Sequence, residues 1–133
     1  MKKFLLYVWQ LPQHLLALIL IFLFMGERKN FDSLDVKYYA LDKKKSFDFG
    51  ASLGDYILFA YNPNEYLMRH ETGHQAQSRI FGWFYLIVIG IPSISGNIFD
   101  RLFHKKWDVR KRFEWYYNLP WEKDANRRAN IIN

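Results

Sequence analysis

Five consecutive residues, His70-Glu71-Thr72-Gly73-His74, constrain this 133-residue chain more than any other part of it. On a helix, residues four apart lie on the same face, so both imidazoles can point at one ion. The carboxylate of Glu71 lies beside them, within reach of a metal-bound water. This is the HExxH pattern, in which one helix supplies two zinc ligands and a base. The turn and cap residues Asn62 to Asn64 predict a helix from about Glu65 to Phe81.

A catalytic zinc ion usually has three protein ligands, so a third must come from another part of the chain. Glu122 is the best candidate, in the segment Leu119-Pro120-Trp121-Glu122-Lys123-Asp124-Ala125-Asn126. With this segment the chain resembles the gluzincin-type zinc metallopeptidases, which carry HExxH on one helix and a glutamate on a second. The resemblance implies that His70 and His74 are ligands, that Glu71 is the general base, and that Glu122 is the third ligand.

Asn126 lies one helical turn after Glu122, where those families often have aspartate. It could accept a hydrogen bond from the free ring nitrogen of a ligand histidine and so fix the orientation of the ring. A third histidine six residues after His74, the metzincin pattern, is absent because that position is Ile80. Other downstream side chains remain open as the third ligand: His104, Asp100, Glu114 and Asp124.

The chain is also similar, over most of its length, to a group of small uncharacterised bacterial membrane-associated proteins. The shared segments are Trp9–Gln13, Gly50–Ile57, the His-Glu-x-Gly-His-x-x-Gln-Ser core at His70–Ser78, and Ile89–Ser93. This resemblance implies one common design and names no substrate.

Composition narrows the classes of function. The chain has no cysteine, which excludes a cysteine-ligated zinc ion and any disulfide. Its net charge of +6 and its 20% aromatic content favour a lipid interface, because basic and aromatic side chains are typical of such surfaces. The same charge could suit nucleic acid, but the chain contains no recognised nucleic-acid-binding motif, so nucleic acid is not expected as a partner.

The N-terminal segment is apolar from Phe4 to Met25 and follows two lysines. Its length is close to that of a membrane-spanning helix, and no signal-peptidase site follows it. We therefore expect residues 1–26 to form an uncleaved membrane-associated helix, followed by a metal-binding domain at residues 27–133. Polar residues at Gln10–His14 interrupt this segment and are expected to face protein.

A second apolar run, Ile80–Pro92, separates the HExxH segment from Glu122. All three ligands must lie on one side of a membrane, unless the site lies within the bilayer. This predicts that Ile80–Ile98 dips in and returns, or forms a buried hairpin at Pro92–Gly96. The basic residues that follow this run favour a cytoplasm-facing site at the bacterial inner membrane.

Between the N-terminal segment and the HExxH helix, Lys37–Leu41 is expected to be a strand, and the stretch from Phe47 to Tyr61 a small β-hairpin. Gly50–Ile57 could bind an extended peptide by strand addition, or could merely cover the helix. Tyr116 and Tyr117 are candidates, by their position before Glu122, to donate to an oxyanion.

Together these features predict an α+β, mostly helical fold with a zincin-like metal-site helix pair, a small β-hairpin and an N-terminal apolar membrane-associated helix. The function we expect is that of a membrane-associated zinc metallopeptidase that hydrolyses peptide or protein substrates and contacts membrane lipid. One alternative is a non-catalytic membrane protein whose zinc ion is structural. Another is a membrane-interacting accessory protein without metal.

Overall fold

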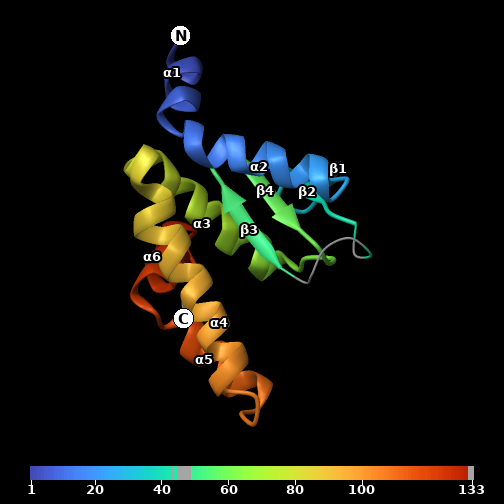
Figure 1. The fold of residues 1–133 in the computed structure, drawn as a ribbon, viewed down its shortest axis with the longest axis vertical. Coiled ribbons are helices and arrows are strands. Elements are labelled where there is room, and N and C mark those ends of the chain that lie inside the picture. Colours follow the sequence, from blue (N-terminus) through green and yellow to red (C-terminus); the bar gives the residue numbers. More distant parts are fainter. Residues whose placement is uncertain (43, 45–48, 132–133) are drawn as a thin grey trace.

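A computed structural model describes residues 1–42, 44 and 49–131 of the chain. The fold is α+β and mostly helical, as predicted, and Figure 1 shows its arrangement. The elements, in chain order, are α1 (Lys2–Trp9), α2 (Leu11–Leu23), β1 (Glu27–Phe31), β2 (Val36–Ala40), β3 (Gly50–Leu53), β4 (Tyr56–Phe59), α3 (Glu65–Phe81), the 3-10 turn η1 (Gly82–Phe84), the π-helical turn η2 (Leu86–Gly90), α4 (Ile91–Phe103), α5 (Val109–Tyr117) and α6 (Pro120–Arg128).

The four strands form one sheet in the order β1-β2-β4-β3. Two antiparallel hairpins, β1–β2 and β3–β4, meet where β2 runs parallel to β4. The β3–β4 hairpin confirms the expected one, except that residues 47 and 48 lie outside the described part of the chain. Its turn places Gly54 at a φ of 68°, which glycine adopts without strain. The β1–β2 hairpin enlarges the sheet beyond our expectation, because the exposed, mostly polar β1 lacks an apolar alternation.

The sheet is covered on both faces at β4, which explains why β4 is almost wholly apolar. Leu58 packs toward α2, in a cluster that contains Ala17 and Leu53. Ile57 and Phe59 point to the opposite face of the sheet, into a cluster with Met68 of α3. Successive residues of a strand face opposite sides, so β4 holds α2 and α3 on the two faces of one sheet.

The N-terminal apolar segment forms two helices rather than one. α1 and α2 are bent by 77° at a break beside Gln10, and Pro12 lies in the first turn of α2, where a missing N–H costs no helical hydrogen bond. The polar residues at the break face protein, as expected. The side chain of Gln13 donates to Ser78 of α3 at 2.8 Å, and Ser78 donates to Gln10 at 2.6 Å. These bonds fix the start of α2 on α3.

The expected hairpin at Pro92–Gly96 is wrong. α4 runs unbroken through both residues, because Pro92 lies in its first turn and Gly96 packs against Leu119 instead of turning the chain. The chain turns earlier, at Gly82, whose φ is 53°. Within the described residues, Leu86–Phe103 is the one helix long and apolar enough to cross a membrane; α1 and α2 would qualify only as a bent pair.

Beyond α4, helices α5 and α6 fold back so that α6 packs against α3 (Figure 1). The two helices approach closely at Gly73, where a Cβ atom would lie 1.9 Å from the carbonyl oxygen of Ala125. This contact places Glu122 of α6 next to the HExxH residues of α3. It also explains how a long apolar helix can separate these residues in sequence without separating them in space.

Candidate metal centre

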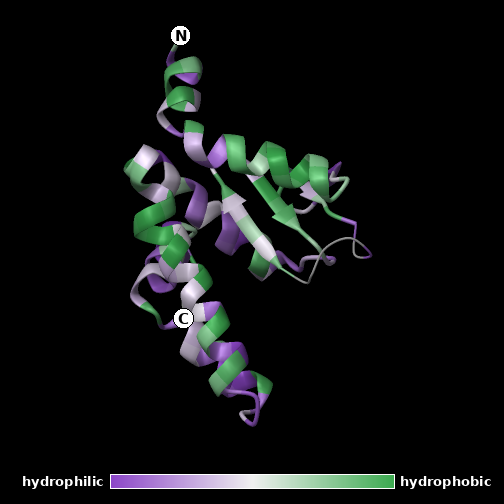
Figure 2. Ribbon diagram, in the orientation of Figure 1, coloured by the Kyte–Doolittle hydropathy of each residue, from purple (hydrophilic) through white to green (hydrophobic). Residues whose placement is uncertain are grey.

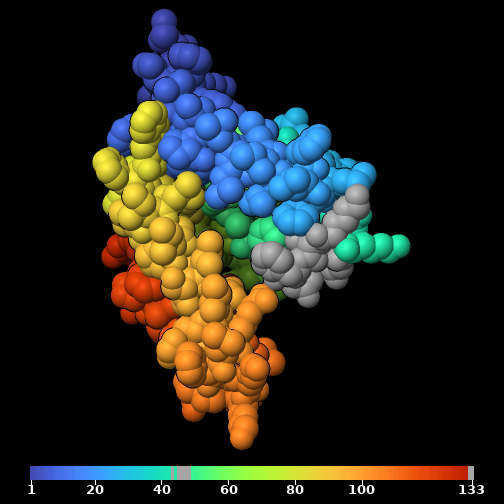
Figure 3. All heavy atoms as spheres, in the orientation of Figure 1, coloured from blue at the N-terminus to red at the C-terminus, as the bar shows by residue number. Residues whose placement is uncertain are grey.

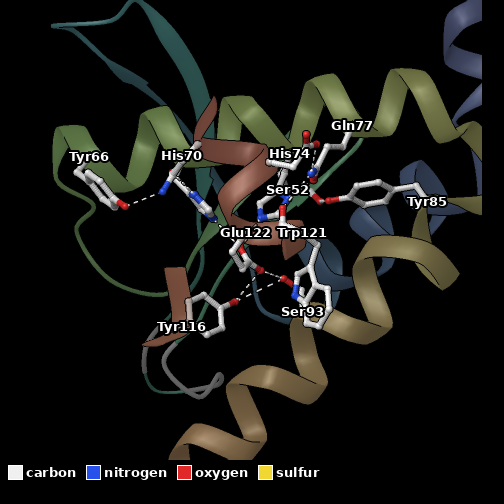
Figure 4. Close-up of polar contacts among 12 residues, drawn as sticks. Ser52, Tyr66, His70, His74, Gln77, Tyr85, Ser93, Tyr116, Trp121 and Glu122 are labelled. Atoms are coloured by element: carbon white, nitrogen blue, oxygen red, sulfur yellow. Dashed lines mark hydrogen bonds and ion pairs between the residues drawn. The ribbon is translucent and has the colours of Figure 1, made fainter. Parts of the chain in front are cut away.

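Three buried side chains converge between α3 and α6. His70 and His74 project from one face of α3, and their Nε2 atoms lie 2.8 Å and 3.0 Å from Oε2 of Glu122. One ligand atom from each residue lies within 4.8 Å of the others, a group that could hold a metal ion. The two imidazoles and Glu122 point toward one another in Figure 4. The helical spacing of four residues and the close packing at Gly73 together produce this geometry.

The outer nitrogens of both imidazoles are occupied by amide side chains. His70 donates through Nδ1 to Oδ1 of Asn126 at 2.6 Å, and His74 donates through Nδ1 to Oε1 of Gln77 at 2.7 Å. Each amide is itself anchored: Asn126 donates to the hydroxyl of Tyr66, and Gln77 donates to the carbonyl oxygen of Trp121 and to Asp124. Such bonds fix the tautomer that leaves Nε2 as the metal-facing atom.

The second oxygen of the Glu122 carboxylate is held from the other side. Oε1 accepts a hydrogen bond from the hydroxyl of Tyr116 at 3.0 Å and another from Ser93 of α4. Helix α4 therefore contributes to the centre, a role that no sequence motif predicted. With one oxygen fixed in this way, Oε2 alone faces the two histidines, as a monodentate ligand would.

Contacts between Glu122 and the histidines shift the pKa values of Glu122 and His74. Burial by itself would raise the pKa of Glu122, but hydrogen bonds from His70 and His74 outweigh it and hold that pKa well below its usual range. Burial would lower the pKa of His74, but the contact with Glu122 raises it to about 9. A proton is therefore held between His74 and Glu122 at neutral pH.

Glu71 lies beside this cluster, and its pKa shifts in the opposite direction to that of Glu122. Burial raises the pKa of its carboxyl group, and the nearby imidazoles only partly oppose that shift. Its Oε2 atom is buried and has no hydrogen-bond partner among the described residues. A buried carboxylate oxygen without a partner is rare and points to a functional role or to a bound group. Among the described residues, one oxygen of Glu71 therefore lacks a hydrogen-bond donor, and it lies next to the three converging side chains.

The centre opens into a cavity of about 130 Å³. His70 and Glu71 form part of its wall, together with Gly50 at the start of β3. Its remaining lining comes from Phe49, Tyr61, Leu67, Asn97, Arg101, Tyr116 and Tyr117. The cavity therefore borders Glu71 directly.

The donor set fits zinc. Two imidazole nitrogens and one carboxylate oxygen are a common ligand set of catalytic zinc sites, which leave a fourth position for water. Bonds of about 2.0–2.1 Å in a tetrahedral site place ligand atoms about 3.3 Å apart. The atoms of His70 and His74 lie 2.8 Å and 3.0 Å from Glu122, and all three ligand atoms lie within 4.8 Å of one another, so side-chain movements would bring them to that spacing. The unpartnered oxygen of Glu71 would then have a metal-bound water to accept from.

The other candidate ligands lie elsewhere. His104 bonds to Asp100 at 2.9 Å and stacks on Trp107, near the far end of α4. Glu114 is exposed and pairs with Arg110 on the surface of α5. Asp124 faces Gln77 and two arginines of α6. Of the two tyrosine candidates, Tyr116 contacts Glu122, whereas Tyr117 packs its ring edge-on against His70.

Gln77, Ser93 and Tyr66 contact this centre but were not predicted. Gln77 could have been noted, because it lies one turn after His74 on the same helix. The other two could not, because their positions depend on how α4 and α6 pack.

Searches against protein-family models, curated protein sequences and solved structures found no match to this chain.

Proposed function

We propose that the protein is a zinc-dependent metallopeptidase whose general base is Glu71. The observation that carries the proposal is the buried, unpartnered oxygen of Glu71 beside the cluster of His70, His74 and Glu122, at the wall of a cavity. A structural zinc ion usually has four protein ligands and needs no neighbouring base. A peptidase needs that base within reach of the same water.

Zinc bound by these three residues would polarise a peptide carbonyl and lower the pKa of a bound water to roughly 7. The carboxylate of Glu71 takes a proton from the attacking water as the new C–O bond forms. Glu71 then gives that proton to the departing amine nitrogen as the C–N bond breaks, so the water is consumed and Glu71 is regenerated. Burial raises the pKa of Glu71, which makes its carboxylate a stronger proton acceptor than an exposed glutamate.

The tyrosines supply donors near the reacting carbonyl. Burial, followed by the nearby carboxylates, raises the pKa of both Tyr116 and Tyr117, so each hydroxyl keeps its proton at neutral pH. Both residues line the cavity. We infer that one of them donates to the oxyanion that forms when water attacks, as such donors stabilise charge only in the transition state.

The edge of β3 supports a peptide as the substrate. β3 is an outer strand of the sheet, and the carbonyl of Ser52 points away from β4, where it accepts from Tyr85 at 2.9 Å (Figure 4). Residues two apart in an antiparallel strand direct their backbone groups to the same side. The N–H and C=O of Gly50 therefore face the cavity edge, where an extended peptide could pair with them.

A structural zinc ion is the second candidate, and one observation favours it: Glu122 is fully buried and both of its oxygens are bonded. Replacement of Glu71 separates the two candidates. We expect Glu71→Gln to keep zinc and the folded state while lowering peptide hydrolysis by about 10²–10⁴-fold, the usual contribution of a general base. Glu114→Gln, an equivalent change at an exposed carboxylate, should leave both properties unchanged. Zinc-dependent folding without hydrolysis in the wild type would favour the structural role.

We also infer that the protein works at a membrane. The helix Leu86–Phe103 is long and apolar enough to span one, and only 11% of it is buried, unlike the core helix of a soluble protein. The basic residues after it favour a cytoplasm-facing site at the bacterial inner membrane. Fractionation of cells that express the full chain tests this: release of the protein by salt alone would argue against an apolar attachment.

A further inference from the structure

Two apolar helical surfaces lie in the same layer of the molecule. Helix α2 and the segment from Trp83 to Phe99 form the near face in Figures 2 and 3, and Leu86 packs against the cluster beneath α2. We call the exposed apolar residues of these two elements the apolar face. They are Leu15, Leu16, Leu18, Ile19, Phe22, Leu23, Trp83, Phe84, Ile87, Val88, Ile91, Ile94, Ile98 and Phe99.

On this face nearly all exposed side chains are apolar. Every exposed position of α2 is apolar, as is every one from Trp83 to Phe99 except Ser95. Beneath these helices lie fully buried polar side chains, among them Gln13, His14 and Gln77. Exposed contiguous apolar surface of this kind marks a contact with lipid or with another protein.

Basic and aromatic residues precede and follow the apolar face along the chain, a pattern that indicates lipid. Lys2 and Lys3 precede it along α1, and Lys105 and Lys106 follow α4. Trp107 lies beside them under the ammonium group of Lys111, at 4.1 Å from its ring centre. Lysine and tryptophan gather where hydrocarbon meets headgroups, and lysines attract anionic headgroups.

The cavity of the metal centre is lined in part by residues of α4 that neighbour this face. Asn97 and Arg101 of α4 line the cavity, and the neighbouring residues Ile94 and Ile98 are exposed on the apolar face. In Figure 3 the surface is hollowed between α2 and α4, and atoms of the β3 and α3 region are visible within the hollow. A chain that enters the cavity from this side would come from the lipid surface.

We infer that the apolar face is seated in a lipid bilayer with anionic headgroups, and that the cavity opens there. Resting on the proposed peptidase function, this makes the substrate a polypeptide segment at the border of a membrane, unwound into an extended strand beside β3. A segment held at the lipid border would reach Glu71 through this opening.

The seating can be measured without any hydrolysis. The chain has no cysteine, so single variants accept one environment-sensitive fluorophore each. Ile19→Cys, Ile94→Cys and Asn97→Cys should shift to the blue on vesicles of phosphatidylcholine and phosphatidylglycerol, and spin-labelled lipid should quench them. Lys123→Cys, an exposed position on α6, should not respond. Unchanged emission at Ile19 and Ile94 would overturn the seating. So would a blue shift without vesicles that grows with protein concentration, because a second copy would then cover the face.

The substrate class is tested by mapping new N-termini in a mixture of membrane vesicles and soluble proteins from one cell type. The zinc-loaded full chain is compared with Glu71→Gln. We expect wild-type-dependent termini to cluster beside membrane-spanning segments. Termini spread over soluble proteins would overturn this inference and leave the peptidase proposal standing. No wild-type-dependent termini at all would refute the peptidase proposal itself, and this inference with it, whatever the fluorophores report.

Discussion

Replacing Gly73 by alanine should disrupt the centre without touching any ligand. A Cβ atom at position 73 would lie 1.9 Å from the carbonyl oxygen of Ala125, whereas an ordinary contact is at least 3.4 Å. Both groups belong to helical backbone, so α3 and α6 must separate by about 1.5 Å, the difference between the two distances. Glu122 lies one turn before Ala125 and would move with it. A metal site tolerates displacements of only about 0.2 Å.

The expected cost of Gly73→Ala has two parts. Overpacking costs about 1–3 kcal/mol, and the weakened hydrogen bonds from His70 and His74 to the Glu122 carboxylate would add about 1–3 kcal/mol more. A loss of roughly 3 kcal/mol would lower the Tm of a domain this size by about 10 °C. Differential scanning fluorimetry measures the Tm, and competition with a chromogenic chelator measures zinc affinity. Both should fall.

The matched control is Gly90→Ala. There a Cβ atom would lie 3.4 Å from Leu86, an ordinary contact, and the helical backbone favours alanine over glycine by up to about 1 kcal/mol. We therefore expect Gly90→Ala to be neutral or slightly stabilising, with zinc affinity unchanged. If Gly73→Ala matched this control in both Tm and zinc affinity, the close packing of α3 on α6 would not be what positions the ligands.

Three further predictions follow from the contacts around the centre. Asn126→Asp should tighten zinc binding, because a charged acceptor makes His70 a stronger ligand. Asn126→Leu should weaken zinc binding about 10–100-fold. Equal zinc affinities of the two variants, measured by chelator competition, would contradict this. Zinc must displace the proton that His74 holds with a pKa of about 9, so zinc affinity should rise with pH up to that value, and about one proton should be released per ion near pH 7. Calorimetry in two buffers with different ionisation enthalpies counts the released protons. A pH-independent zinc affinity would exclude this displacement. Ser78→Ala should cost about 1–3 kcal/mol in urea unfolding, since it leaves the buried side-chain oxygen of Gln10 without its donor; an unchanged midpoint would mean that this bond does not hold α2 on α3.

Local sequence signals predicted the local elements well. The helix from Glu65 to Phe81 was predicted with its bounds, because Asn64 caps its first turn and Gly82 ends it with a positive φ. The β3–β4 hairpin followed from its glycine punctuation and apolar alternation. Each of these signals lies within a few residues of the feature it specifies, so no knowledge of tertiary packing was needed.

Features that depend on packing were missed or wrong. Pro92 suggested a turn, yet a proline in the first turn of a helix is compatible with its continuation, and only the contact of Gly96 with Leu119 shows why α4 stays straight there. The contact of Ser93 with Glu122 likewise depends on the path of α4 past α6. The sequence could name the three converging residues by analogy, but the partners that orient them emerged only from the fold.

Elemental mass spectrometry of the purified full chain shows whether His70, His74 and Glu122 hold one zinc ion. We expect about one zinc per chain in the wild type and in Glu114→Gln, and almost none in His74→Ala or Glu122→Gln. Circular dichroism of each variant would show that the helices persist. A wild type without zinc after supplementation, or a Glu122→Gln variant that keeps it, would contradict the account.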